Sequence, residues 1–292
     1  MHDSFVKYDP KVNMLFLVGA VVLGMFFRHP AFSFAAVLFS FLYYFSIKGR
    51  KGIKFLIGMI ILTALLSVIN PIFTQLGDHV LFTYFGRLFT LEAMICGACT
   101  AMLLVAVLTW FACFNAIMSS DRLIYCFSGI APSIALTVST ILGLIPRFKR
   151  KVKQLSGARD CIGLGSEEKG RFKSSAPIAS ALVSWALEGG ITTADSMQCR
   201  GYGCGPRTSF ALYKFDRKNV IMTIVMAALI IAVAVCGLKG GMTTSFYPLL
   251  DCTGFDNVYT LFGMICYCIF MFIPTALNIK ETISWHCSRS KI

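Results

Sequence analysis

The stretch LEAMICGACTAMLLVAVLTWFACFNAIM, residues 91–118, is an apolar run that holds one acidic residue and no basic residue. A helix that crosses a bilayer needs about 20 consecutive apolar residues, so this stretch predicts a membrane-spanning helix. Of the 292 residues in the chain, 57% are hydrophobic and 14% are charged, whereas soluble domains carry about 25% charged residues. The composition therefore argues against a soluble enzyme and favours a protein that crosses the bilayer several times.

Five further apolar stretches raise the prediction to about six membrane helices, at residues 12–27, 31–47, 55–69, 220–238 and 258–279. The last two are long enough to span, whereas the first three are short. Only Arg28, His29 and Pro30 separate the first two, and they suit a tight turn between helices. That pair is either a spanning or a re-entrant hairpin, and both alternatives return the chain to its starting side. The sequence thus predicts an all-α polytopic membrane protein.

The charges are few but unbalanced, with 27 Lys and Arg against 14 Asp and Glu. A basic excess suggests nucleic-acid binding in a soluble protein, but in a membrane protein it marks the loops on the cytoplasmic side. With the N-terminus inside and six crossings, only Arg28, Arg87 and Lys239 fall outside. We therefore expect both termini to be cytoplasmic and no nucleic acid to bind. Some basic residues of 147–153 are expected to contact anionic membrane lipid.

A seventh apolar run, residues 130–146, is expected not to cross the membrane. A crossing there would move the 14 basic residues of 147–218 to the outer face. We expect this run to lie along or under the inner leaflet, or to dip into the helix bundle. The chain then divides into N-terminal membrane helices (1–118), a cytosolic-side segment (119–218) and a C-terminal membrane helix pair with its tail (219–292).

The cytosolic-side segment is too long to lack structure of its own and contains two helical stretches. The first runs from near Pro132 to about residue 157, and the second from about residue 174 to Arg200, where Gly189 and Gly190 leave two shorter helices as an alternative. Each stretch ends in an arginine motif followed by glycines, and the two motifs consist of Ala158, Arg159 and Asp160, and of Cys199, Arg200 and Gly201.

Two interpretations of these arginines stay open on spacing alone. An arginine in the last turn of a helix is stabilised by the partial negative charge of that helix end. Alternatively, an arginine at the tip of a rigid helix can reach into a groove of a partner and form a forked bond to a carboxylate.

The residues around these arginines resemble a known family. Residues 194–203, ADSMQCRGYG, are similar to the second Ala-Arg-Gly signature of the transmembrane component (T component) of energy-coupling factor (ECF) transporters, in the cobalt-transport permease family. Residues 144–147, LIPR, and 156–160, SGARD, resemble the first signature and its lead-in. The apolar and basic layout is similar from about residue 9 to residue 280.

The resemblance implies a subunit of a prokaryotic importer rather than an enzyme. In that family two long coupling helices dock on two ABC-type ATPase subunits, and the membrane helices hold a small S component that binds a vitamin or a metal ion. Arg159 and Arg200 would be the coupling residues, each in a groove of one ATPase. The chain departs from the signatures at Asp160, where glycine is frequent, and at Cys199, where alanine is typical. The alternative is a substrate-binding permease subunit of another ABC-type transporter.

No cofactor or metal is expected on this chain itself. It lacks a Gly-x-x-x-x-Gly-Lys-Ser/Thr loop, so ATP and Mg²⁺ would be used by partner ATPases. Cys161, Cys199 and Cys204 flank the two arginine motifs and would have to approach each other to bind zinc, for which no fourth ligand is evident. We find no paired carboxylates or His/Asp set that would favour a membrane enzyme.

Overall fold

The computed structural model describes residues 5–27, 29–73, 80–84, 87–129, 131–163, 171–205, 216–240 and 258–289. The chain separates into two compact units, each described here by itself. The membrane unit comprises Met1–Leu123 and Tyr213–Ile292, and the helix-pair unit comprises Ile124–Leu212. The boundary between them falls within the short helix α5 (Ser120–Ser128).

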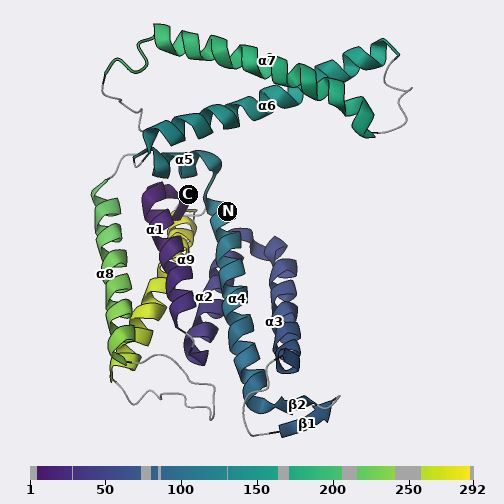
Figure 1. Ribbon diagram of the computed structural model, residues 1–292. Coiled ribbons are helices and arrows are strands. Elements are labelled where there is room, and N and C mark those ends of the chain that lie inside the picture. The colour runs from purple at the N-terminus through teal and green to yellow at the C-terminus, as the bar shows by residue number, and fades with distance from the viewer. Residues whose placement is uncertain are drawn as a thin grey trace. The chain divides into compact units, whose positions relative to one another are not determined.

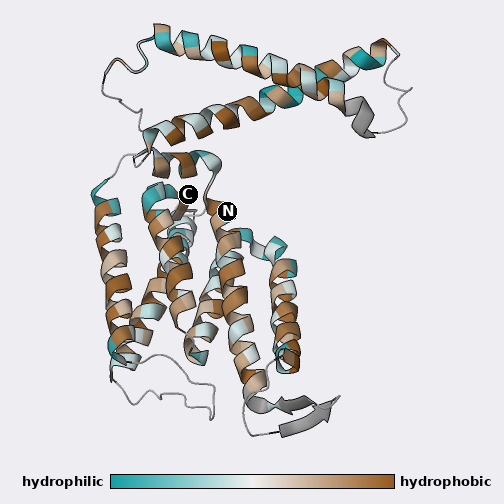
Figure 2. Cartoon of the chain, viewed as in Figure 1, coloured by the Kyte–Doolittle hydropathy of each residue, from teal (hydrophilic) through white to brown (hydrophobic). Residues whose placement is uncertain are grey.

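The membrane unit is a bundle of apolar helices, as Figures 1 and 2 show. Within the described residues, four stretches are long and apolar enough to cross a membrane, and the first of them holds both α2 and α3, while α1 is a shorter apolar helix. The prediction of an all-α polytopic membrane protein is thus confirmed. The helices are α1 (Pro10–Phe26), α2 (Pro30–Lys48), α3 (Ile53–Phe73), α4 (Leu91–Ile117), α8 (Arg217–Gly240) and α9 (Val258–Arg289), with 3₁₀ turns η1 (Phe5–Lys7) and η2 (Gly49–Gly52).

Side-chain caps explain where the first membrane helices begin. Asp9 Oδ1 accepts a hydrogen bond of 2.9 Å from the backbone N–H of Lys11, and Pro10 occupies the first helical position. His29 caps α2 in the same way, because its Nδ1 accepts from the N–H of Ala31 at 3.2 Å and a proline again follows. Such caps satisfy donors that a helix start leaves unpaired, and proline suits a position that needs no donor.

A small β-hairpin, not expected from the sequence, lies between α3 and α4. Strand β1 (Val80–Tyr84) pairs antiparallel with β2 (Arg87–Thr90). These are the only strands among the described residues. Thr90 ends the hairpin and begins α4, since its hydroxyl accepts from the N–H of Ala93 at 3.4 Å. The hairpin therefore leads directly into the long helix that the opening apolar run predicts.

Aromatic rings from four helices form the core of the membrane unit around Phe16. The Phe16 ring lies 5.4 Å from Phe5, 5.4 Å from Trp110 and 5.0 Å from Phe270, measured between ring centroids. Tyr43 of α2 lies 5.9 Å from Trp110. All five side chains are essentially inaccessible to solvent. Offset and edge-on ring pairs add about 0.5–1.5 kcal/mol each beyond burial, so this cluster ties η1, α1, α2, α4 and α9 together.

Helix α3 packs closely on α4 at Gly97. A Cβ atom added there would lie 2.6 Å from Cβ of Asn70 on α3, closer than side-chain carbons normally approach. A small residue at a membrane helix contact allows this approach. Gly58 of α3 offers a contrast, because an added Cβ there would meet nothing within 4 Å.

We expect Gly97→Ala to destabilise the membrane unit by about 1–3 kcal/mol, because Asn70 has to move to admit the new methyl group. Gly58→Ala is the matched control, and we expect it to be neutral or to stabilise by up to about 1 kcal/mol. Thermal unfolding of both purified variants in the same detergent measures the difference. Equal melting temperatures for the two variants would contradict the close packing of α3 and α4.

A second prediction concerns His29. Burial lowers the pKa of His29 below its ordinary value of 6.5, and its Nδ1 accepts the capping bond only in the neutral form. The folded protein therefore binds fewer protons than the unfolded chain as pH falls below 6.5, so stability is lost in that direction. We expect His29→Asn to keep a cap, worth about 1 kcal/mol, and to remove this pH dependence. Melting temperatures between about pH 7.5 and pH 5.5 test this, and parallel curves for both proteins would refute it.

Candidate functional site

The candidate site lies on the two long helices of the helix-pair unit, α6 (Pro132–Cys161) and α7 (Arg171–Cys199), which cross each other in Figure 1. Phe148 and Trp185 pack at the crossing, with ring centroids 5.6 Å apart and planes at 83°. Nζ of Lys151 lies 5.9 Å from the centroid of the Trp185 ring. Both contacts fall near the midpoint of each helix, so each helix extends well beyond the crossing in both directions.

Both helices are continuous in spite of residues that usually interrupt helices. α6 contains Pro146 and α7 contains Pro177. From the sequence, Gly189 and Gly190 left two shorter helices as an alternative, but the structure has one continuous helix there. The hydroxyl of Thr193 donates to the carbonyl of Gly189 at 2.6 Å, and that of Thr192 donates to the same carbonyl at 3.1 Å. The arginine motifs are therefore carried by unbroken helices.

The second motif forms the C-terminal cap of α7. Gly201 adopts φ +79°, and its N–H donates to the carbonyl of Gln198 at 3.0 Å. The N–H of Tyr202 donates to the carbonyl of Met197, also at 3.0 Å. This pair of bonds around a left-handed glycine is the Schellman motif, which closes helices. Cys199 is the last helical residue and Arg200 follows it, and both side chains are exposed.

The first motif lies inside the last turn of α6 rather than at its cap. Gly163 has φ +79°, and its N–H donates to the carbonyl of Asp160 at 3.2 Å. Arg159 thus precedes its left-handed glycine by four residues, whereas Arg200 precedes Gly201 directly. Arg159 is half-buried, while Ala158 and Asp160 are exposed. The two arginines therefore leave their helices differently, one from the side of the last turn and one from the tip.

The two motifs lie at opposite ends of the helix pair. Arg200 lines a surface hollow of about 440 Å³ together with Leu136, which belongs to the start of α6, so the end of α7 lies beside the start of α6. At 1.5 Å per residue, Arg159 lies about 16 Å beyond Phe148 and Arg200 about 22 Å beyond Trp185. The arginines are therefore separated by up to about 40 Å.

The hollow at the end of α7 is suited to contact with a protein. Besides Arg200 and Leu136 its walls hold Met197 and Tyr202, and Gly201, Gly203 and Gly205 add bare backbone. A guanidinium beside apolar and aromatic side chains can bind a carboxylate while the surrounding residues exclude water. Sequence reasoning singled out Arg200 but missed Leu136, which lines the same hollow only because α6 and α7 cross antiparallel.

The same crossing separates the three cysteines that flank the motifs. Cys161 ends α6, whereas Cys199 and Cys204 lie at the end of α7, so the three do not come together. Within the described residues no group of three His, Cys, Asp or Glu side chains is placed to hold a metal ion. The approach of all three cysteines that a zinc site would need is therefore not found.

Apolar stripes, which we did not expect from the sequence, run along both helices. The members on α6 follow a spacing of three and four residues, which is one helix face, and those on α7 repeat every four. All are exposed in this unit, and such stripes usually mark contact with a protein or a membrane. They consist of Ile134, Val138, Ile141, Ile145 and Val152 on α6, and of Val183, Leu187 and Ile191 on α7.

No protein-family model matches the chain, and a search of curated proteins gives no significant match. Function is therefore inferred from the signature-like residues and from the geometry of the two helices.

We expect Gly201→Val to loosen the end of α7 that carries Arg200. A β-branched residue at φ +79° is strained by about 1–3 kcal/mol, so the closing bonds of Gly201 and Tyr202 weaken. Gly190→Ala is the control, because its added Cβ meets nothing within 4 Å and alanine favours the helix by about 1 kcal/mol. Amide hydrogen exchange at position 201 and at Tyr202 should accelerate in Gly201→Val and not in Gly190→Ala. Unchanged exchange there would contradict the cap.

Proposed function

We propose that this chain is the transmembrane energy-coupling component, or T component, of an ECF-type ABC importer in the cytoplasmic membrane of a prokaryote. One observation carries the proposal: two long helices cross at Phe148 and Trp185 and bear an arginine at each of two opposite ends. The chain acts as a coupling subunit and not as an enzyme, and ATP and Mg²⁺ are used by its partners.

The spacing of the arginines supports two ATPase partners rather than one. α6 and α7 are each about 45 Å long, more than the roughly 30 Å diameter of a small domain, and the arginines lie at opposite ends of the pair. Arg159 and Arg200 therefore engage two different ATPase subunits. Their different placement, in the last turn of α6 and at the tip of α7, gives each subunit its own contact geometry.

The exposed apolar surfaces support a further partner in the membrane. Ile57, Ile61, Leu65 and Val68 of α3 are all at least half exposed, as are several members of the stripes on α6 and α7. Lipid covers such surfaces, and so does another apolar protein. We assign the S component to these surfaces. The S component selects the vitamin or metal ion, so the identity of the cargo is not written in this chain.

The distribution of basic residues supports the orientation. Helices α1, α3 and α8 begin, and α2 ends, at one end of the membrane unit (Figure 1). Lys7, Lys48, Lys54 and Lys218 lie at these helix ends. Lys239 lies at the opposite end of α8. A basic end faces the cytoplasm, so we place this end of the membrane unit on the cytoplasmic side.

The decisive experiment is co-purification of the chain with its co-expressed ATPase subunits. We expect Arg159→Glu or Arg200→Glu alone to weaken retention, and the double variant to reduce it at least ten-fold, because each substitution removes a forked charge contact worth about 2–5 kcal/mol. Arg200→Lys should give an intermediate result, because lysine keeps the charge and loses the fork.

The control variant makes an equal change of charge on α6 and leaves both arginine motifs intact. Lys149→Glu combined with Lys153→Glu makes the same net change on the exposed middle of α6. This control should retain the ATPases at close to the wild-type level. Retention by the arginine double variant at the level of this control would overturn the assigned roles of Arg159 and Arg200.

A further inference from the structure

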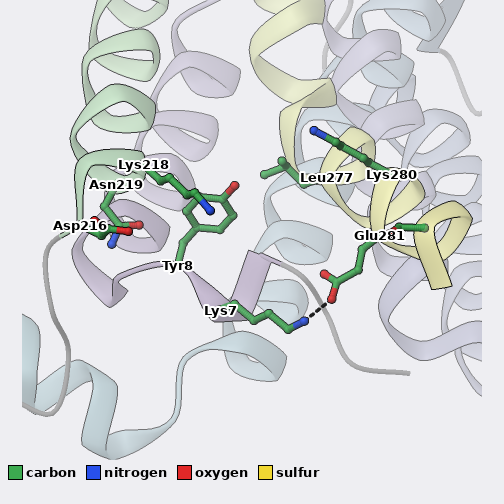
Figure 3. Close-up of a pocket in the computed structure, with 9 residues that line it drawn as sticks. Lys7, Tyr8, Asp216, Lys218, Asn219, Leu277, Lys280 and Glu281 are labelled. Atoms are coloured by element: carbon green, nitrogen blue, oxygen red, sulfur yellow. Dashed lines mark hydrogen bonds and ion pairs between the residues drawn. The ribbon is translucent and has the colours of Figure 1, made fainter. Parts of the chain in front are cut away.

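A cavity of about 510 Å³ opens at the basic end of the membrane unit, between the start of the chain, the start of α8 and the last part of α9. Figure 3 shows the side chains that line it. Three of them are lysines, and they come from three separate segments. The lining residues are Lys7, Tyr8, Asp216, Lys218, Asn219, Leu277, Lys280, Glu281 and Ser284.

Both acidic residues of the cavity are engaged within the protein. Asp216 caps α8, since its Oδ1 accepts from the N–H of Arg217 at 2.8 Å and its carbonyl accepts from the N–H of Asn219 at 2.9 Å. Glu281 forms an ion pair with Lys7, drawn as a dashed line in Figure 3. The negative charges are thus compensated locally, one by a helix start and one by a lysine.

Two cations are left over for a ligand. Among the residues that the structure describes, neither Lys218 nor Lys280 makes an ion pair. In Figure 3, Lys280 extends its amino group from α9 toward the side of the cavity that holds Tyr8 and Lys218. Tyr8 and Ser284 add hydroxyl groups to the same lining, and Leu277 adds an apolar side chain. Two amino groups with neighbouring hydroxyls suit the oxygens of a phosphate group.

The level of the cavity relative to the membrane indicates which kind of phosphate compound binds there. Arg217 and Lys218 precede the apolar part of α8, and Lys280 and Glu281 follow the apolar part of α9, so the cavity lies where both helices leave the hydrocarbon. This is the level at which lipid headgroups lie. Leu277, one helical turn before Glu281, faces the cavity from within the span of α9 and can contact the apolar part of a lipid.

We propose that this cavity binds the headgroup phosphate of an anionic phospholipid, held by Lys218 and Lys280. The ion pair between Lys7 and Glu281 and the cap at Asp216 form part of its walls. Bound lipid bridges α8 and α9 at their basic ends. The site is distinct from the basic residues 147–153 of α6, and it does not depend on the proposed coupling to ATPases.

The test is the stabilisation of the purified full-length chain by added lipid in a neutral detergent. Phosphatidylglycerol should raise the melting temperature of the wild type, whereas phosphatidylcholine, which carries no net charge, should have little effect. Lys218→Gln combined with Lys280→Gln should raise the half-saturating phosphatidylglycerol concentration about thirty-fold, from about five-fold per lysine near the surface. Lys280→Arg, which keeps the charge, should respond like the wild type.

The control is Lys51→Gln combined with Lys54→Gln, because these exposed lysines lie at the same end of the unit but outside the cavity. It should keep the wild-type response to phosphatidylglycerol. Equal loss of response in both double variants would mean that only general surface charge attracts the lipid, and this would overturn the site. Stabilisation by millimolar inorganic phosphate without any effect of phosphatidylglycerol would overturn the lipid assignment and identify a soluble anion as the ligand.

Discussion

Hydrocarbon offers no hydrogen-bond partner to the backbone, and the architecture of the membrane unit depends on this constraint. Every embedded segment must satisfy its own N–H and C=O groups, so each is a helix. The first backbone N–H groups of each helix also lack partners within the helix. The side chains of Asp9, His29 and Thr90 accept hydrogen bonds from such groups. The β-hairpin is compatible with the same constraint because it lies between two spans, where its edges need not face lipid.

Once the helices exist, packing rather than burial from water has to hold them together, since lipid is as apolar as their side chains. The rings around Phe16 pack against one another in the interior, and two of these ring pairs are edge-on. Gly97 lets α3 approach α4. Large apolar side chains such as Ile61 and Leu65 remain exposed on the outer surface. This distribution would be unstable in water and is the expected one in a bilayer.

The fold class and the six apolar helices were predictable because length and hydropathy are local properties of the sequence. The hairpin was not, because Val80–Tyr84 and Arg87–Thr90 are stabilised by pairing with each other. The ends of α6 and α7 were predictable to within a few residues from Gly163 and Gly201. The position of Leu136 beside the hollow of Arg200 and the separation of Cys161 from Cys199 could not be predicted, because both follow from the antiparallel crossing of α6 and α7. The aromatic pair at that crossing joins residues far apart in the sequence.

That crossing also bears on how the helix pair transmits movement in the proposed function. Contact between α6 and α7 is concentrated where Phe148 and Lys151 meet Trp185. Arms of about 16 Å and 22 Å extend from it to the two arginines. Because continuous helices resist bending, a displacement at either arginine reaches the crossing as a rotation of one helix against the other. The exposed stripes on both helices turn with it, so a protein seated on them would sense the relative movement of two distant ATPase contacts.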